Sequence, residues 1–299
     1  MARGYINIAI VKYWGKKEFN PYLVPMQGSI SLRSNKLYTE TDVSESDKDI
    51  FILNGKIQDE NETKKIFSFV DKVMEQRKIN RKPICIDSKN FVPTAAGLAS
   101  SASAYCTLTQ ALNDFFKLNL TIEEMAKIST MGSGSACRSF YNISAFDKNG
   151  EIYELKTELN LAMLAIVLND KKKELPSRDA MEIAKKSPIY SMWVKRANED
   201  FEKMKLALLE NDFIKIGNIM EKNTIIMHNT TFKSNPSFSF LTKETYFVIK
   251  IVKRLRMKGL NIFTTMDAGP NVKVLYLKEN EEKVLKELNK YFGGKIVLC

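Results

Sequence analysis

The sequence predicts an α+β protein with two lobes. The chain has 299 residues, which exceeds one average domain. Its first half alternates short β-type runs with helical patterns, whereas the second half is rich in helical periodicity and ends in strands. The pattern changes near 165–175, so we expect an N-terminal domain over 1–168 and a C-terminal domain over 169–299.

The elements of the first half follow from apolar spacing. "YINIAIV" (5–11) predicts a buried strand, and "TDVSESDKDIFILNGK" (41–56) predicts two strands, with "LNGK" as a hairpin turn. Helical spacing predicts a helix over 63–78, and alternation predicts a strand over 82–88. Past Gly97 apolar residues occupy so much of the helical surface that this helix must be buried.

The second half opens with "EIYELKTELNLAMLAIVL" (151–168), which predicts two strands. The expected helices span 178–187, 189–209, 212–229 and 239–259. The chain then closes with strands at 260–265 and 272–277, a helix at 279–292 and the strand "KIVLC". We find no internal repeat and no low-complexity tract.

Composition indicates an ordinary globular protein, with 44% hydrophobic and 27% charged residues. No stretch approaches the roughly 18 apolar residues of a membrane helix, and the first residues lack signal-peptide features. The four cysteines show neither CxxC pairing nor metal-ligand spacing: Cys85, Cys106, Cys137 and Cys299. We therefore expect reduced thiols, a cytoplasmic location and no membrane partner.

The formal charge is +11, from 46 basic and 35 acidic residues. A nucleic-acid surface, a cleft for small polyanions or a generally lysine-rich surface would each give such a charge. The basic residues are scattered, with "DKKKE" (170–174) as the only triple. Scattered lysines favour a solvated surface over a nucleic-acid site.

"NFVPTAAGLASSASA" (90–104) sets small residues and serines at the start of the buried helix. Small side chains let a ligand reach the main chain, and the free N–H groups of a helix start suit a phosphate. The hydroxyls of Ser100 and Ser101 are suited to phosphate oxygens or Mg²⁺. Neither GxxxxGK[ST] nor GxGxxG is present, and a serine-capped helix packed through alanines explains the segment equally well.

"GSGSACRS" (132–139) is a second segment of this kind and favours the phosphate interpretation. Its Arg138 can grip a carboxylate or phosphate through two parallel hydrogen bonds. The alternative for this segment is an ordinary loop with a surface arginine. Two anion-friendly loops in one chain make that alternative less attractive.

"VKYWGKK" (11–17) follows the first strand, with Lys12 and Lys16 on either side of Tyr13 and Trp14. The lysines can bind a diphosphate, and the aromatic rings can form a fixed surface with N–H and O–H donors. Taken alone, this segment is more typical of a basic strand end that packs one tryptophan.

"TTMDAGPNVKVLYL" (264–277) places Asp267 before a turn between two strands, where a carboxylate is held firmly. In "PSRDAM" (176–181), Ser177 stands at an expected helix N-cap beside Arg178, and capping is the default role for that serine. His228, the only histidine, is more typical of a structural residue than of a catalytic one.

Together these motifs resemble the diphosphomevalonate decarboxylase family of the GHMP kinase superfamily. The segments "NIAIVKYWGKK", "NFVPTAAGLASSASA", "SGSACRS", "PSRDAM" and "FTTMDAGPN" occur in the family's order and span nearly the whole chain. Bacterial members look most similar. The resemblance implies a two-lobed GHMP kinase-like fold with mixed or antiparallel sheets, a helix-rich C-terminal lobe and an active-site cleft between the lobes.

The resemblance also implies a reaction. ATP would phosphorylate the tertiary 3-hydroxyl of mevalonate 5-diphosphate, because hydroxide is a poor leaving group. Loss of phosphate and then CO2 would give isopentenyl diphosphate, with Mg²⁺ as the metal ion and a homodimer as the assembly. A related enzyme that only phosphorylates a mevalonate-type alcohol, or that decarboxylates the monophosphate, is the alternative within the superfamily, and a basic nucleic-acid-binding protein is a more remote one.

By motif position, Asp267 would orient or deprotonate the 3-hydroxyl, Lys12 would lie near the transferred phosphoryl group, and Arg138 would hold the substrate carboxylate. The residues expected to line the substrate site, mainly at its diphosphate, are Tyr13, Trp14, Gly15, Lys16, Ser133, Gly134, Ser135, Ala136, Cys137, Ser177 and Arg178. The residues expected at ATP are Asn90, Pro93, Ala95, Ala96, Gly97, Leu98, Ala99, Ser100 and Ser101. Ser101 would also be the magnesium ligand.

The chain departs from the family pattern at a few positions. "MQGSISL" (26–32) has Gly28 where relatives usually carry a serine, and "LRSNK" follows where many members have small polar residues. Cys137 replaces a serine of some relatives. "YNISAFDKNG" (141–150) has Asn142 where a glycine is common, so we expect this loop to bend differently. These changes bear on the substrate side of the site more than on the reaction class.

Overall fold

The computed structural model describes residues 1–17, 21–92, 100–169 and 175–299. The strands are β1 Ala2–Val11, β2 Lys16–Lys17, β3 Val24–Pro25, β4 Ser29–Glu45, β5 Ile50–Leu53, β6 Lys56–Ile57, β7 Ile84–Phe91, β8 Ile143–Phe146, β9 Ile152–Glu154, β10 Leu161–Ile166, β11 Phe263–Met266, β12 Val272–Leu277 and β13 Ile296–Leu298. The helices are α1 Glu60–Gln76, α2 Ser100–Phe116, α3 Ile122–Ser129, α4 Ser177–Ala184, α5 Tyr190–Leu209, α6 Phe213–Phe232, α7 Lys243–Met257 and α8 Glu281–Phe292, with 3-10 turns η1 Ala136–Ser139 and η2 Lys278–Asn280.

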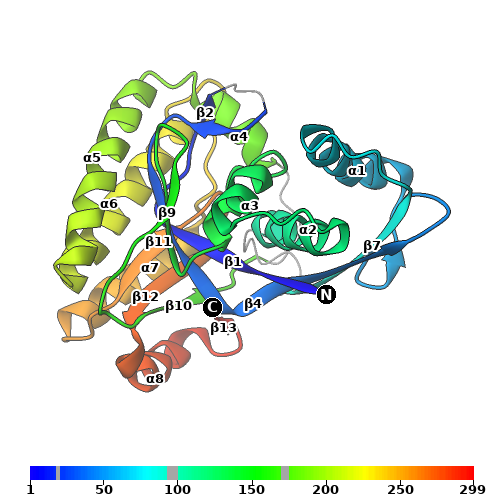
Figure 1. Cartoon of the computed structure of the whole chain (residues 1–299). Coiled ribbons are helices and arrows are strands. Elements are labelled where there is room, and N and C mark those ends of the chain that lie inside the picture. The colour runs from blue at the N-terminus through cyan, green and yellow to red at the C-terminus, as the bar shows by residue number, and fades with distance from the viewer. Residues whose placement is uncertain (18–20, 93–99, 170–174) are drawn as a thin grey trace.

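The N-terminal sheet is centred on the long strand β4. It pairs antiparallel with β1, β7 and β8, and β5 adds a parallel pair with β7. Helix α2 packs on β1 and β4, while α1 lies at the far end of the sheet beside β5 (Figure 1). Apolar residues of α1, β7 and α2 form one core there, including Val70, Ile86 and Leu112. The mixed sheet agrees with the fold predicted from the sequence.

The C-terminal sheet is antiparallel, in the order β11-β12-β10-β13. Helices α7 and α8 pack on it through a core that includes Val252, Val274 and Leu288. Strand β10 (Leu161–Ile166) therefore belongs to this sheet, although it precedes most of the helix-rich half. The division into 1–168 and 169–299 stays a prediction.

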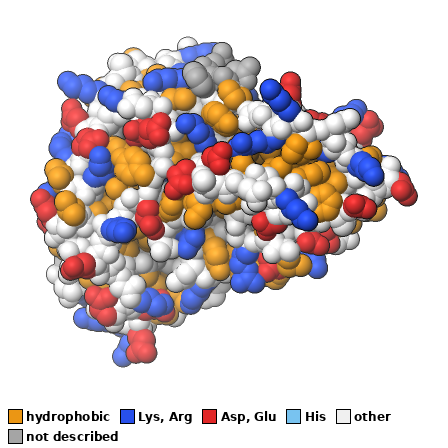
Figure 2. Space-filling model, in the orientation of Figure 1, with side chains coloured by type: hydrophobic (Ala, Val, Ile, Leu, Met, Phe, Trp, Pro, Cys, Tyr) orange, Lys and Arg blue, Asp and Glu red, His pale blue; other side chains and the backbone are white. Residues whose placement is uncertain are grey.

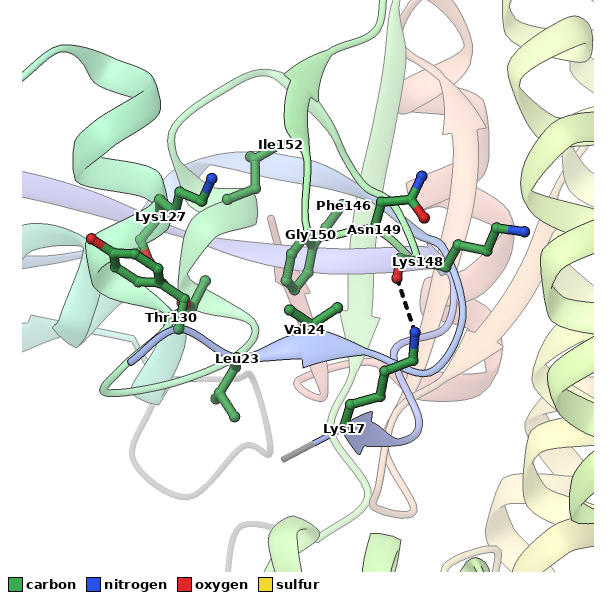
Figure 3. A pocket seen from close by; sticks show the side chains of 11 residues that line it. Lys17, Leu23, Val24, Lys127, Thr130, Phe146, Lys148, Asn149, Gly150 and Ile152 are labelled. Atoms are coloured by element: carbon green, nitrogen blue, oxygen red, sulfur yellow. Dashed lines mark hydrogen bonds between the residues drawn. The ribbon is translucent and has the colours of Figure 1, made fainter. Parts of the chain in front are cut away.

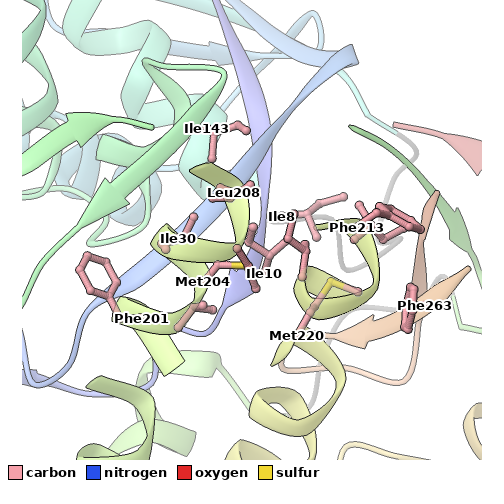
Figure 4. Packing of buried hydrophobic residues seen from close by; sticks show 14 of the residues in the cluster. Ile8, Ile10, Ile30, Ile143, Phe201, Met204, Leu208, Phe213, Met220 and Phe263 are labelled. Atoms are coloured by element: carbon pink, nitrogen blue, oxygen red, sulfur yellow. The ribbon is translucent and has the colours of Figure 1, made fainter. Parts of the chain in front are cut away.

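A shared hydrophobic core joins the two halves. Helices α5 and α6 run side by side (Figure 1) and carry Met204 and Met220 against Ile8 and Ile10 of β1 (Figure 4). Phe263 of β11 completes this core from the C-terminal sheet. Because β1 is packed from this side, the residues that follow it are held firmly in place. Those residues form the "KYWGK" segment.

The structure corrects the expectation for 141–150. Ile143–Phe146 does not form a loop, because it is the fully buried strand β8, which pairs with β4 and β9. Helix α3 was not predicted, although Thr121 and Glu124 form a capping box at its start, and that box can be recognised in the sequence.

The surface bears out the scattered charge predicted from the sequence. On the face shown in Figure 2, acidic and basic side chains are interspersed. Over the part of the chain that the structure describes, no helix is both long enough and apolar enough to span a bilayer.

Candidate active site

Asp267 lies where strand β11 turns into β12, and its carboxylate joins two lysines. Lys12 Nζ is 2.8 Å from Oδ1, and Lys273 Nζ is 3.0 Å from Oδ2. Both lysine side chains are only 2% exposed, whereas a quarter of the aspartate side chain remains accessible. The carboxylate is thus fixed from both sides and still open to a ligand.

This arrangement holds Asp267 in its charged form. Burial alone would raise the pKa of Asp267, but the charges and hydrogen bonds of Lys12 and Lys273 outweigh burial and hold the pKa well below its usual range. Burial also lowers the pKa of Lys12 to about 8, and the positive charges of Lys273 and Arg138 act in the same direction, against the attraction of Asp267. The ion pair is therefore formed at neutral pH.

Lys12 is positioned by a chain of buried hydrogen bonds. Its Nζ donates to the carbonyl oxygen of Ala9 at 2.9 Å, and its backbone N–H donates to Asn223 Oδ1 at 2.9 Å. The Asn223 amide in turn donates to Asp200 Oδ2 at 3.1 Å. Through these hydrogen bonds, helices α5 and α6 fix the residue that follows β1 beside the turn that carries Asp267.

Lys273 was not among the residues predicted from the sequence. It is the second residue of β12, in "VKVLYL", and its neighbours in that strand are buried. A charged residue inside an otherwise apolar central strand is rarely buried without a partner, and this signal was present in the sequence.

Arg138 lies on η1 and is 3% exposed. Its guanidinium stacks over the ring of Tyr13, with 5.5 Å between the guanidinium carbon and the ring centroid. Its Nε and Nη1 are buried without a hydrogen-bond acceptor among the residues that the structure describes. Burial lowers the pKa of Arg138, and the negative charge of Asp267 opposes that shift. A buried guanidinium with free donors is suited to an anionic ligand.

The rest of the "GSGSACRS" segment lies against Tyr13. A side chain at Gly134 would collide with the Tyr13 hydroxyl, so a larger residue there would displace Tyr13. The hydroxyls of Ser133 and Ser135 are 3.1 Å apart. Ala136 and Cys137 are buried in η1, and burial raises the pKa of the Cys137 thiol to about 12. The cysteine is therefore a packing residue.

In the "KYWGK" segment, Trp14 and Gly15 pack inside the protein, whereas Lys16 is partly exposed. Trp14 is 2% exposed, and its indole N–H donates to Thr230 Oγ1 at 2.9 Å, so this donor is already used within the protein. Gly15 has φ +148°, and a side chain there would strike the Tyr190 hydroxyl, which donates to the Trp14 carbonyl oxygen. Lys16 is half-buried on β2.

The prediction that Ser177 is the N-cap of a helix is wrong. Pro176 occupies the cap position of α4, and Ser177 is the first helical residue, so the helix begins one residue earlier than predicted. Arg178 is exposed. Burial raises the pKa of the Tyr13 hydroxyl, and the positive charge of Arg178 acts against this rise. His228 is buried against Phe240, and burial lowers its pKa to about 3, so it is neutral at physiological pH. This agrees with the structural role predicted for it.

Most of the residues expected at ATP lie outside the described residues. Pro93, Ala95, Ala96, Gly97, Leu98 and Ala99 lie outside the described residues, as does the side chain of Ser100. Ser101 is exposed in the first turn of α2. Asn90 Oδ1 accepts from Thr39 Oγ1 at 2.9 Å, and this hydroxyl also contacts Ser103 of α2 at 2.7 Å. Asn90 is thus linked to the start of the helix predicted to face a phosphate.

The positions that depart from the family pattern fit this structure. Gly28 packs directly on the Phe201 ring, which leaves no space for a larger residue. Arg33, from "LRSNK", donates to Asn142 Oδ1 at 2.6 Å, and its backbone N–H donates to the Asn142 carbonyl oxygen at 2.8 Å. Two of the departures therefore contact each other.

The fold and the site together define an enzyme-like centre for a small anionic molecule, with a fixed carboxylate, two buried lysines and a guanidinium two of whose nitrogens have no acceptor among the described residues. Comparison with known proteins makes this more specific. Residues 4–152 match the diphosphomevalonate decarboxylase-like N-terminal domain, and residues 163–297 match the mevalonate 5-diphosphate decarboxylase C-terminal domain.

Individual relatives agree with these matches. Diphosphomevalonate decarboxylase from Candida albicans is 32% identical, over 96% of this chain and 87% of the relative. The crystal structure of mevalonate diphosphate decarboxylase from Staphylococcus aureus is 36% identical with a TM-score of 0.93, over 100% of this chain and 95% of that chain. A structure described as "MDDEF in complex with MVAPP, AMPPCP and Magnesium" is 37% identical with a TM-score of 0.92, over 99% and 94% of the two chains. This chain belongs to the diphosphomevalonate decarboxylase family.

Proposed function

We propose that this protein catalyses the ATP-dependent decarboxylation of mevalonate 5-diphosphate to isopentenyl diphosphate, with release of ADP, phosphate and CO2. The observation that carries the proposal is the Asp267 carboxylate between Lys12 and Lys273. Family membership along nearly the whole chain supports the same reaction.

In this proposal Asp267 acts on the 3-hydroxyl of the substrate. A carboxylate held at so low a pKa cannot ionise an alcohol in advance, so the proton moves only as the phosphoryl group is transferred. Its main contribution is to orient the hydroxyl. After phosphate departs, the negative charge of Asp267 stabilises the electron-poor tertiary carbon.

Lys12 and Arg138 supply the positive charge. Lys12 stabilises the transferred phosphoryl group, and Lys273 keeps Asp267 in place when Lys12 contacts a phosphate. Arg138 has two buried donors without an acceptor in the described part of the chain, and it binds the substrate carboxylate and holds it in place for loss of CO2. Tyr13, Lys16, Ser133, Ser135, Ser177 and Arg178 are proposed to bind the substrate, mainly at the diphosphate.

ATP is proposed to bind at the start of α2, with Asn90 close to the nucleotide. An exposed hydroxyl at Ser101 and the free N–H groups of a helix start suit phosphate and Mg²⁺, because Mg²⁺ takes few protein ligands and completes its shell with phosphate oxygens and water. When bound, Mg²⁺ would neutralise charge on the transferred phosphoryl group. The similar structure described with MVAPP, AMPPCP and magnesium supports a nucleotide and Mg²⁺ as ligands of this protein.

The test is to supply purified protein with ATP and either mevalonate 5-diphosphate or the monophosphate, and to measure ADP and CO2 together. We expect equal amounts of ADP and CO2 from the diphosphate. ADP without CO2 would indicate a kinase and would refute the proposal, and preference for the monophosphate would assign the related decarboxylase activity. We also propose a homodimer, on the family resemblance alone, which sedimentation would test.

A further inference from the structure

A pocket of about 450 Å³ lies between two hairpins and helix α3, and Asp267 is not among the described residues that line it. The hairpin β2–β3 contributes Lys17, Tyr22, Leu23 and Val24, helix α3 and its end contribute Lys127 and Thr130, and the β8–β9 hairpin contributes the rest (Figure 3). Its volume lies in the range of small-molecule sites, roughly 300–1,000 Å³. We call it the lysine pocket.

The lysine pocket has an apolar interior. Phe146 is fully buried, Ile152 is 9% exposed, and Val24 and Leu23 are half-buried. Gly150, at φ +92°, brings the β8–β9 turn close to Val24. A hydrocarbon group of a few carbons would gain from burial against this surface.

Three lysines surround that interior, and none of the described residues that line it is acidic. Within the described part of the chain, Lys17, Lys127 and Lys148 form no ion pair. Lys17 Nζ donates to the Lys148 carbonyl oxygen at 3.4 Å, which keeps these two residues together (Figure 3). The nearby Asp147 carboxylate already accepts backbone N–H groups of its own turn, at 2.8 and 3.0 Å. The three charges are therefore available to an anion.

The pocket adjoins the aromatic pair beside the catalytic centre, and none of its described lining residues was assigned to that centre. Phe146 lines the pocket and also stacks on Tyr13, with centroids 6.4 Å apart and planes inclined by 26°. Lys16 and Lys17 are neighbours on β2, so their side chains point to opposite faces of that hairpin. An occupant of the lysine pocket would contact the back of the aromatic pair that supports Arg138.

We propose that the lysine pocket binds a short branched hydrocarbon diphosphate, the chemical class of the reaction product, outside the catalytic centre. The choice of this ligand class rests on the proposed function. The product carries a hydrocarbon tail, whereas the substrate tail bears a hydroxyl and a carboxylate that the apolar interior would leave without partners. The pocket therefore discriminates product from substrate, and the lysines bind the diphosphate as point charges.

The experiment is equilibrium dialysis of the full-length protein with labelled isopentenyl diphosphate. Saturating mevalonate 5-diphosphate without ATP blocks the catalytic centre and prevents turnover. We expect about one molecule of product per chain under this block. The double variant Lys127→Gln/Lys148→Gln should bind it at least tenfold more weakly. The matched control Lys253→Gln/Lys286→Gln, which removes two exposed lysines elsewhere, should bind it as the wild type does.

Several outcomes would overturn the proposal: no product bound under the block, an equal loss in both double variants, or inorganic diphosphate bound as tightly as isopentenyl diphosphate. The initial decarboxylation rate of Lys127→Gln/Lys148→Gln should stay within about twofold of wild type, and a lost rate would place these lysines in substrate binding instead. A wild-type protein that releases no CO2 would refute the proposed function, while the dialysis would still report on the pocket.

Discussion

Replacing Asp267 with asparagine keeps the shape of the side chain and removes its charge, so it tests how tightly the carboxylate and the two lysines are coupled. In the variant the ammonium groups of Lys12 and Lys273, each 2% exposed, lose their counter-charge. Breaking a buried ion pair by removing one partner costs about 3–5 kcal/mol. A lysine can escape this cost by releasing its proton, which at pH 7 costs about 4.6 kcal/mol from a pKa near 10.4.

These two values bracket the effect. We expect Asp267→Asn to lower the free energy of unfolding by about 3–4.5 kcal/mol at pH 7, which is a large part of the total stability of a typical domain. Burial lowers the pKa of Lys12 in the folded state, and the variant lacks the Asp267 charge that opposes this shift, so its unfolded chain binds more protons than its folded one. Stability of the variant must then rise with pH, and the deficit relative to wild type should shrink by up to about 1.4 kcal/mol per pH unit below pH 8.

Urea unfolding at pH 6, 7 and 8 measures both quantities. The fluorescence of Trp14 and Trp193 reports the transition, because both side chains are almost fully buried. Asp267→Glu serves as a control that retains the charge. A variant as stable as wild type at pH 7, or a deficit that does not change with pH, would show that the carboxylate does not hold the lysines and would refute the reasoning.

Three further predictions concern catalysis. Arg138→Lys should lower kcat/KM at least tenfold, because lysine keeps the charge but loses the planar fork stacked on Tyr13; an unchanged value would argue against a grip on the substrate carboxylate. The wild-type kcat/KM should fall above pH 8, since the pKa of Lys12 is lowered to about 8 and the neutral amine no longer stabilises a phosphoryl group; a profile that stays flat to pH 9.5 would contradict this role. Gly134→Ala should raise KM for mevalonate 5-diphosphate by displacing the Tyr13 hydroxyl, with little change in KM for ATP, and equal effects on both would indicate a general distortion.

Much of the fold was predictable because it depends on local periodicity. The helix expected over 189–209 is α5, Tyr190–Leu209, and the strand expected over 272–277 is β12 with the same bounds. The turn of "LNGK" is the β5–β6 turn, where Asn54 and Gly55 adopt positive φ. Strand β8 was missed because its four residues lie between polar segments and become buried only through pairing with β4.

Individual site residues could be predicted from the sequence, but the contacts between them could not. Lys12 and Asp267 were singled out from separate motifs, and they lie 255 residues apart in the chain. Nothing local shows that two lysines share one carboxylate, or that Asn223 holds the backbone of Lys12, because such contacts arise only from packing between the lobes. Trp14 shows what the local pattern can predict: taken alone, its segment was more typical of a strand end that packs one tryptophan, and its N–H donates to Thr230 Oγ1 within the protein. Its place at the substrate stays a prediction.

The most direct test of the central claim compares wild type and Asp267→Asn for release of labelled CO2 from carboxyl-labelled mevalonate 5-diphosphate with ATP, with substrate affinity measured separately without ATP. If the carboxylate between Lys12 and Lys273 directs phosphorylation of the 3-hydroxyl, the variant should lose about 10³-fold in kcat and keep its substrate Kd within a few-fold. A folded variant that releases CO2 within tenfold of the wild-type rate would contradict the account.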